Sequence, residues 1–293
     1  MPSPTEQYRE VTPELLASWP LPEADDSKYG RGQVVVVGGA RRSPGAAMLS
    51  GISALRVGAG RLTLAVGGSV AVAVATAVPE CGIVALDETP AGSVSGFGLP
   101  SASDDLRSAD AVLVGPGLDS ADEAGVMVRE LSRYLADDAV VVLDAFGLGV
   151  LPEVEGVTER LGGRLVLTPN KVEAALLLER ELDEGNLEQE IAEIARRYRA
   201  AVSCFGVVAD PDGSVWSVGA GVNGLATSGS GDVLAGAILG LCARGATPAQ
   251  AAVWATWAHK EAGERLSRRI APLGFLASEL PGELPPVIAS IRA

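Results

Sequence analysis

The chain has 293 residues, 47% hydrophobic and 20% charged, which is typical of a globular protein with a sizeable core. Its formal net charge of −14 argues against binding to nucleic acids or anionic membranes, because both would repel it. Three cysteines without C-x-x-C spacing argue against a disulfide framework or a structural zinc site. The sequence shows neither a signal-peptide pattern nor an apolar run of membrane-spanning length, so we expect a cytoplasmic protein.

Short β-branched segments alternate along the chain with longer segments whose apolar residues recur at helical spacing. In chain order the pattern predicts a strand at 34–37, a helix at 46–57, strands at 62–66 and 111–114, a helix at 122–136, and strands at 140–144 and 165–168. Helices at 172–179 and 187–198 follow, and then a hairpin formed by 207–209 and 215–218 around Pro211-Asp212-Gly213. Helices at 232–243 and 248–266 come next. One further helix can fit 276–293, although the proline-rich 284–286 is interpreted as a tail.

This alternation of strands and helices indicates right-handed crossovers and a mostly parallel sheet covered by helices on both faces. We therefore expect a single α/β domain over residues 1–293, with a mostly parallel central sheet between helical layers. Active sites in such sheets lie at the carboxyl ends of the strands. The segments at those ends are Gly38-Gly39, Gly115-Pro116-Gly117, Asp144 and Thr168-Pro169-Asn170.

The most informative segment is the glycine-rich stretch 223–236, in which small residues run directly into an apolar helix. Helix starts leave amides unpaired and carry partial positive charge, and glycines let an anion come close. The amides of 229–232 are therefore candidates for binding a phosphoryl group, and Asp232 is placed to take a proton from a substrate hydroxyl. An equally good interpretation makes Asp232 an ordinary helix N-cap. The stretch is neither a Walker A loop nor a dinucleotide G-x-G-x-x-G motif.

Six segments share their order and spacing with one family of proteins. They are Tyr29-Gly30 before 34–39, Ser43-Pro44-Gly45-Ala46-Ala47, Ala54-Leu55-Arg56-Val57-Gly58-Ala59-Gly60, Gly115-Pro116-Gly117-Leu118, Leu167-Thr168-Pro169 with Glu173, and Gly229-Ser230-Gly231-Asp232. Together they resemble the ADP/ATP-dependent NAD(P)H-hydrate dehydratases, a carbohydrate-kinase-like family. The resemblance extends from about Val11 to about Pro286 and implies a ribokinase-like fold.

Members of this family phosphorylate hydrated NADH or NADPH on the ring hydroxyl with ADP or ATP. They then eliminate phosphate, which restores the dinucleotide. The resemblance implies the same lyase activity here, with Asp232 as the base that activates the hydroxyl. The residues implied to stabilise the phosphoryl charge are Gly229, Ser230 and Gly231, and Mg²⁺ is expected to bridge the phosphates.

The resemblance also implies binding residues and partners. Ala47, Gly117 and Asn170 would line the pocket for the hydrated dinucleotide. Asn223 and Gly231 would adjoin the adenine nucleotide, and no side chain is assigned as a metal ligand. Family members commonly assemble as homo-oligomers, often tetramers, so a homotetramer is expected here, and NAD(P)H-hydrate epimerase is the expected functional partner.

Three positions depart from the family pattern. Asn170 stands where the family has histidine, Phe146 replaces the second aspartate of an Asp-Ala-Asp that begins with Asp144, and 203–207 lacks the family's Lys-Gly-x-x-Thr. Two alternatives therefore stay open. One is a ribokinase-like kinase acting on a small vitamin-precursor alcohol, and the other is a nucleotide-binding relative without catalysis.

A few more polar residues have simple structural interpretations. A structural hydrogen bond explains His259, the only histidine, better than catalysis does. Asp144 fits a structural role slightly better than a place near Mg²⁺, and Glu173 fits a first-turn helix carboxylate. Lys171 is a candidate for replacing the lost basic contact.

Overall fold

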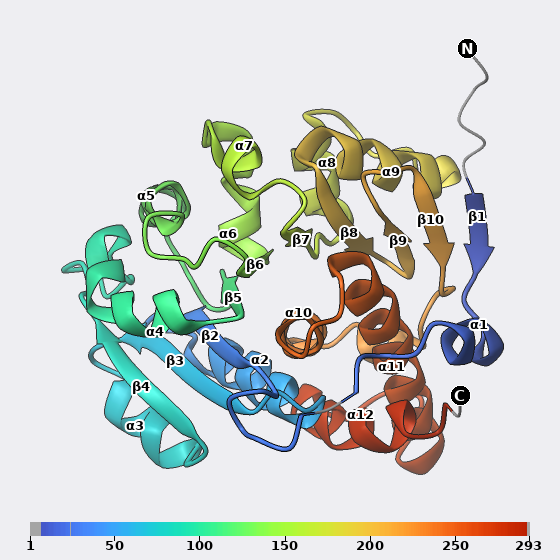
Figure 1. The fold of residues 1–293 in the computed structure, drawn as a ribbon, viewed down its shortest axis with the longest axis horizontal. Helices are drawn as coiled ribbons and strands as arrows, with labels where there is room; N and C mark the ends of the chain where they lie inside the picture. Colours follow the sequence, from blue (N-terminus) through green and yellow to red (C-terminus); the bar gives the residue numbers. More distant parts are fainter. Residues whose placement is uncertain (1–6, 24, 292–293) are drawn as a thin grey trace.

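The computed structural model describes residues 7–23 and 25–291, and its described strands form one sheet of ten (Figure 1). The strands are β1 (Gln7–Glu10), β2 (Gln33–Gly38), β3 (Arg61–Gly67), β4 (Cys81–Leu86), β5 (Ala111–Val114), β6 (Val140–Leu143), β7 (Leu165–Leu167), β8 (Ala200–Cys204), β9 (Val207–Ala209) and β10 (Ser214–Ser217). Their spatial order is β1-β10-β9-β8-β7-β6-β5-β2-β3-β4. Only β9 runs antiparallel to its neighbours, so the predicted mostly parallel sheet is confirmed.

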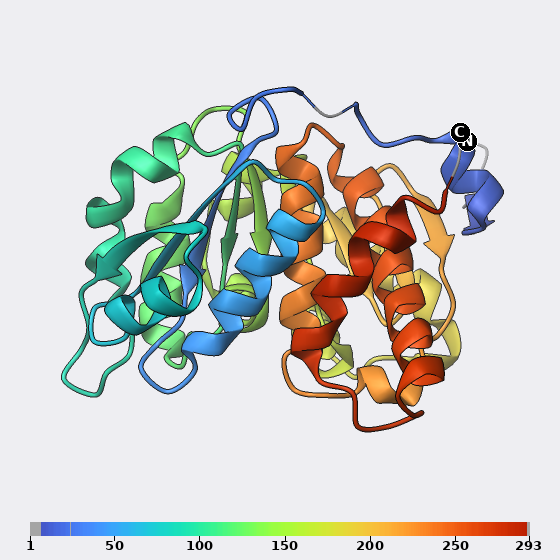
Figure 2. The same cartoon turned by 90° about the horizontal axis from the view of Figure 1, so that it is seen from below.

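Two helical layers cover the faces of the sheet (Figures 1 and 2). One layer contains α1 (Pro13–Ser18), α2 (Pro44–Arg56), α3 (Ala71–Ala77), α10 (Ser230–Ala243), α11 (Pro248–Arg269) and α12 (Leu280–Ile288). The other contains α4 (Ser103–Ser108), α5 (Ala121–Leu131), α6 (Ala145–Gly149), α7 (Val157–Leu161), α8 (Lys171–Leu178) and α9 (Leu187–Tyr198). None of these helices is long and apolar enough to cross a membrane, within the part of the chain that the structure describes.

Strand β2 shows why a central strand of this sheet is a continuous apolar run in the sequence. Val34 and Val36 pack into the core on one face of the sheet, while Val35 and Val37 pack into the core on the other. Side chains alternate between faces along a strand, so a strand covered on both sides must be apolar at every position. The two cores therefore share one sheet.

Helix α10 lies unusually close to α2, and this contact fixes the N-terminal end of α10, which we call its mouth. A Cβ at Gly236 would lie 2.1 Å from the carbonyl oxygen of Ser50, so only glycine fits there. The Ser50 hydroxyl also donates to the carbonyl oxygen of Asp232 over 2.9 Å. The first turn of α10 is thereby held against α2 by both packing and a hydrogen bond.

The differences from the predicted elements lie mainly in short helices and in three strands, of which β8 is inside the sheet. The elements that were not predicted are short segments with few β-branched alternations or helical repeats, namely strands β1, β4 and β8 and helices α1, α3, α4, α6 and α7. The predicted helix at 122–136 ends at Leu131. The interpretation of 284–286 as a tail is wrong, because these residues lie inside α12, where Leu284 is fully buried.

Candidate active site

The carboxyl ends of five neighbouring parallel strands form one row at an edge of the sheet. In spatial order, β8, β7, β6, β5 and β2 are followed by Phe205, Thr168, Asp144, Gly115 and Gly39. The first turn of α10 is at this edge, because the charge of Asp232 in that turn acts on the carboxyl of Asp144 at the end of β6. The predicted position of the site, at the carboxyl ends of the strands, is therefore the position at which the glycine-rich loop begins its helix.

The amides of the loop are only partly committed to the chain's own hydrogen bonds. Gly229 is the N-cap of α10, with a left-handed φ of 92°. The Ser230 amide donates to the Thr227 carbonyl over 3.2 Å. The amides of Gly231 and Asp232 have no acceptor among the described residues, and the space beside the Gly231 Cα is open. Gly231 and Asp232 thus offer two free donors at the positive end of a helix, whereas the Ser230 amide is engaged.

Asp232 lies in the first turn of α10 and is not its N-cap. The alternative interpretation of Asp232 as an N-cap is therefore wrong. Burial raises the pKa of its carboxyl to about 6. At neutral pH the group is mostly ionised yet basic enough to accept a proton, which is the range that suits a general base.

A second carboxyl, that of Asp144, lies at the end of β6, within range of the negative charge of Asp232. It is buried and accepts a hydrogen bond of 2.8 Å from the Thr168 hydroxyl. Burial, and then the negative charge of Asp232, raise the pKa of Asp144 to about 7. The next residue, Ala145, has a φ of 48°, a conformation that costs a non-glycine residue about 1–2 kcal/mol. The two interacting carboxyls and the strained backbone make this a candidate functional position.

His259 has the structural role that the sequence indicates. Its Nε2 lies 3.0 Å from the carbonyl oxygen of Ser230 and 3.0 Å from the Ser230 hydroxyl. Burial lowers the pKa of the imidazole to about 4, so the ring is neutral. A neutral ring can donate to the Ser230 carbonyl without bringing a charge, and it ties α11 to the first residue of α10.

A cavity of about 430 Å³ opens beside the free amides. Its wall includes Asn170, Asn223, Ser230 and Gly231, together with the glycine-rich turns at 205–206 and 219–222. This volume lies in the range of small-molecule sites. Three of the predicted nucleotide and phosphoryl residues therefore share one cavity with Asn170.

The other predicted residues lie outside the wall of that cavity. The Asp232 carboxyl is partly exposed and lies toward Asp144, outside this wall. Gly117 lies against Gly39 and Ser43, and the side chain of Ala47 is fully buried. The structure thus separates a cavity side of the α10 mouth from a carboxylate side, and the roles of Ala47 and Gly117 stay predictions.

Asn170 caps helix α8 as well as lining the cavity. Its side-chain oxygen accepts hydrogen bonds from the amides of Val172 and Glu173, at 2.9 and 3.0 Å. Glu173 in return accepts from the Asn170 amide over 2.9 Å, which completes a capping box. Glu173 is therefore a helix-capping carboxylate, and only the side-chain NH₂ of Asn170 is left to bind a ligand.

Sequence reasoning missed the side chain of Phe205. The ring is 61% exposed, borders the cavity and lies beneath the Lys171 ammonium group, whose nitrogen is 4.0 Å from the ring centroid. The available signal was an aromatic residue at a strand end in a chain with only four phenylalanines. Lys171 also pairs with Glu184 over 2.6 Å, so its charge is compensated.

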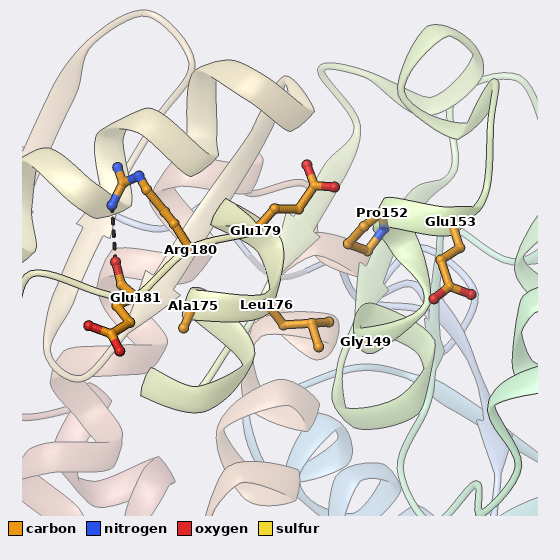
Figure 3. A pocket seen from close by; sticks show the side chains of 8 residues that line it. All are labelled: Gly149, Pro152, Glu153, Ala175, Leu176, Glu179, Arg180 and Glu181. Carbon is orange, nitrogen blue, oxygen red and sulfur yellow. Dashed lines mark hydrogen bonds between the residues drawn. The ribbon is translucent and has the colours of Figure 1, made fainter.

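A second hollow, of about 510 Å³, lies between α6 and α8 (Figure 3). Leu176 and Pro152 provide apolar walls, and Arg180 is engaged by Glu190 and Glu193. None of the residues predicted for catalysis or binding lines this hollow. The predicted phosphoryl and nucleotide residues lie instead at the mouth of α10 and in the cavity beside it.

A mostly parallel sheet between helical layers, with a helix that starts at a glycine-rich loop beside acidic residues, is typical of a ribokinase-like α/β protein. A structure described as a ribokinase-like superfamily protein from Enterococcus faecalis superposes with a TM-score of 0.78 at 19% identity, covering 97% of this chain and 96% of its own. The predicted fold class is confirmed.

Within that class, the chain belongs to the NAD(P)H-hydrate dehydratase family, whose sequence profile matches residues 34–286. It is 40% identical to an ADP-dependent (S)-NAD(P)H-hydrate dehydratase from Xanthomonas campestris, over 96% of each chain. An ADP/ATP-dependent NAD(P)H-hydrate dehydratase from Bacillus subtilis, co-crystallised with ATP/Mg²⁺, superposes with a TM-score of 0.78 at 26% identity, covering 97% of this chain and 99% of its own. A bifunctional NAD(P)H-hydrate repair enzyme from Moorella thermoacetica is 37% identical over 95% of this chain, which spans 54% of that protein.

Proposed function

We propose that this chain dehydrates hydrated NADH or NADPH, with ADP or ATP as the phosphoryl donor. One observation carries the proposal: the free amides of Gly231 and Asp232 lie in the first turn of α10, whose Asp232 carboxyl interacts electrostatically with the buried carboxyl of Asp144. Such an arrangement can both gather phosphoryl charge and accept a proton from a hydroxyl. Family membership supplies the substrate class.

The proposed reaction has two steps. Ionised Asp232 accepts the proton of the ring hydroxyl, whose oxygen bonds to the terminal phosphorus of ADP while the bridging P–O bond breaks and AMP leaves. The free amides of Gly231 and Asp232 stabilise the charge on the transferring group. Inorganic phosphate then departs with the C–O electrons and a ring proton is lost, which restores the double bond of the dihydronicotinamide.

The donor set fits Mg²⁺ bound together with nucleotide. No cluster of three or more His, Cys, Asp or Glu suited to a metal occurs in the described ranges, 7–23 and 25–291. Mg²⁺, however, commonly takes one or two carboxylates and completes its shell with phosphates and water. The Asp144 carboxyl at the end of β6 would supply such an oxygen, and the ion when bound would neutralise phosphate charge.

We further propose that the chain acts as a single domain in the cytoplasm, as a homotetramer, and beside an NAD(P)H-hydrate epimerase. The bifunctional name of the Moorella relative supports a second repair activity near the first. Size-exclusion chromatography with light scattering tests the tetramer.

The central experiment mixes the protein with hydrated NADH, ADP and Mg²⁺ and follows the absorbance of reduced nicotinamide. We expect absorbance to return, with one AMP formed per dinucleotide repaired, and no return without nucleotide. Flat absorbance with phosphorylation of a hydroxymethyl pyrimidine or thiazole would favour a small-molecule kinase. If neither substrate reacts while ADP raises the melting temperature, the chain is a nucleotide-binding relative without catalysis.

A further inference from the structure

Phe205 combines two features that folding alone does not favour. Its ring is 61% exposed to solvent at the turn between β8 and β9. Its backbone has a φ of 49°, in the left-handed region that bulky side chains rarely adopt. An exposed aromatic ring in an unfavourable backbone conformation points to a role outside the core.

The ring is held in place from one side. The Lys171 nitrogen lies 4.0 Å from the ring centroid, and Glu184 holds the same ammonium group at 2.6 Å. Such a cation is attracted to the electron-rich face of an aromatic ring. The chain from Glu184 through Lys171 therefore orients Phe205 and leaves the ring largely exposed.

The ring borders the same cavity as the free amide of Gly231. The wall beside it consists of small residues, including Gly206, Gly219 and Gly221, which present no side chains to a ligand. A flat ligand can therefore reach the ring while its phosphates reach the mouth of α10. Aromatic rings stack on nucleobases through their π-faces.

We infer that Phe205 stacks against the purine base of the nucleotide bound in this cavity and sets its affinity through the base. This inference rests on the proposed use of ADP or ATP. Phe205 is a positioning residue for the donor and takes no part in proton transfer. The Lys171–Glu184 pair acts on the nucleotide only through the ring.

The test compares Phe205→Gly, Phe205→Tyr and wild type by calorimetric titration with ADP and with inorganic pyrophosphate, which lacks a base. Loss of one stacking contact should raise the Kd for ADP about tenfold in Phe205→Gly, whereas the Kd for pyrophosphate stays within twofold. Phe205→Tyr keeps the ring and should bind ADP like wild type. Phe97→Ala removes another exposed phenylalanine, which lies outside the cavity wall, and should change neither Kd.

Thermal unfolding separates this role from a structural one. Glycine adopts positive φ readily, so Phe205→Gly should melt no lower than wild type while binding ADP more weakly. In the dehydration assay its KM for ADP should rise about tenfold with kcat unchanged. Wild-type affinity for ADP in Phe205→Gly, or an equal loss of pyrophosphate binding, would overturn the inference. Failure of wild type itself to bind ADP would instead refute the proposed function.

Discussion

Asp144→Asn tests whether the buried carboxyl beside Asp232 is desolvated. The Asn side chain keeps the shape, and the Thr168 hydroxyl can still donate to Oδ1. Burial raises the pKa of the native Asp144 carboxyl from 3.8 to about 7. The native state therefore binds this proton more tightly than the unfolded state, so wild type loses stability as pH rises from about 4 to about 7. The difference, 7 − 3.8 or about 3 pKa units, corresponds to about 4 kcal/mol.

The variant has no such proton and escapes that loss. Relative to wild type, we expect its free energy of unfolding to rise by about 4 kcal/mol between pH 4 and pH 8, while its turnover falls. Urea denaturation at both pH values, with EDTA and without nucleotide, measures the change, and the melting temperature of the variant relative to wild type should rise by roughly 8 °C over the same pH range. Asp119→Asn, at an exposed position, is the matched control and should show no comparable change. If the gap between Asp144→Asn and wild type is the same at pH 4 and pH 8, the reasoning about burial is refuted.

Three further predictions concern the mouth of α10. Asp232→Asn should lower turnover in the nicotinamide assay at least about 100-fold, and calorimetry should show a Kd for ADP within twofold of wild type. Undiminished turnover would exclude the role of Asp232 as the base. Because burial raises the pKa of Asp232 to about 6, kcat/KM should reach a plateau near pH 7 and drop about tenfold for each pH unit below 6. A kcat/KM at pH 5 equal to that at pH 7 would contradict this. Gly236→Ala would place a methyl group 2.1 Å from the Ser50 carbonyl oxygen. We therefore expect urea denaturation to show a loss of about 1–3 kcal/mol of stability, and we expect the KM for ADP to rise. Gly282→Ala, whose new methyl group meets open space, is its control, and equal stability of the two variants argues against the close α2–α10 contact.

The central strands could be predicted because both of their faces are buried. Their β-branched runs are bounded by turn residues, and the hairpin of β9 and β10 carries its own Pro-Asp-Gly signal. Strand β1 could not be predicted in this way, because Gln7–Glu10 is polar and pairs with β10, some 200 residues away. Strand β8 is built from small residues, and its burial comes from packing that a local pattern does not reveal.

The site divides in the same way between local and long-range information. A glycine-rich loop entering an apolar helix predicts free amides, and Asn170 with Glu173 three residues later carries a capping-box signal. Local sequence does not reveal that the Ser230 amide turns back to Thr227, because that depends on the path of the loop. The proximity of Asp144 to Asp232 likewise depends on how α10 crosses β6, and so does the raised pKa of each carboxyl.

The charge of the site explains how so acidic a chain can hold a nucleotide. The positive charges of the two lysines at the cavity are compensated by carboxylates. Lys171, over the Phe205 ring, pairs with Glu184 at 2.6 Å, and Lys260, in the cavity wall, pairs with Glu264 at 2.8 Å. His259 beside them is neutral, because burial lowers its pKa to about 4. In the proposed function, charge neutralisation of the phosphates would therefore fall to main-chain amides at the α10 mouth and to a divalent cation, both of which act at short range. Such a site attracts phosphate only where the amides point, and so it would place the transferring phosphorus in the helix turn that carries Asp232, the carboxylate proposed to receive the proton.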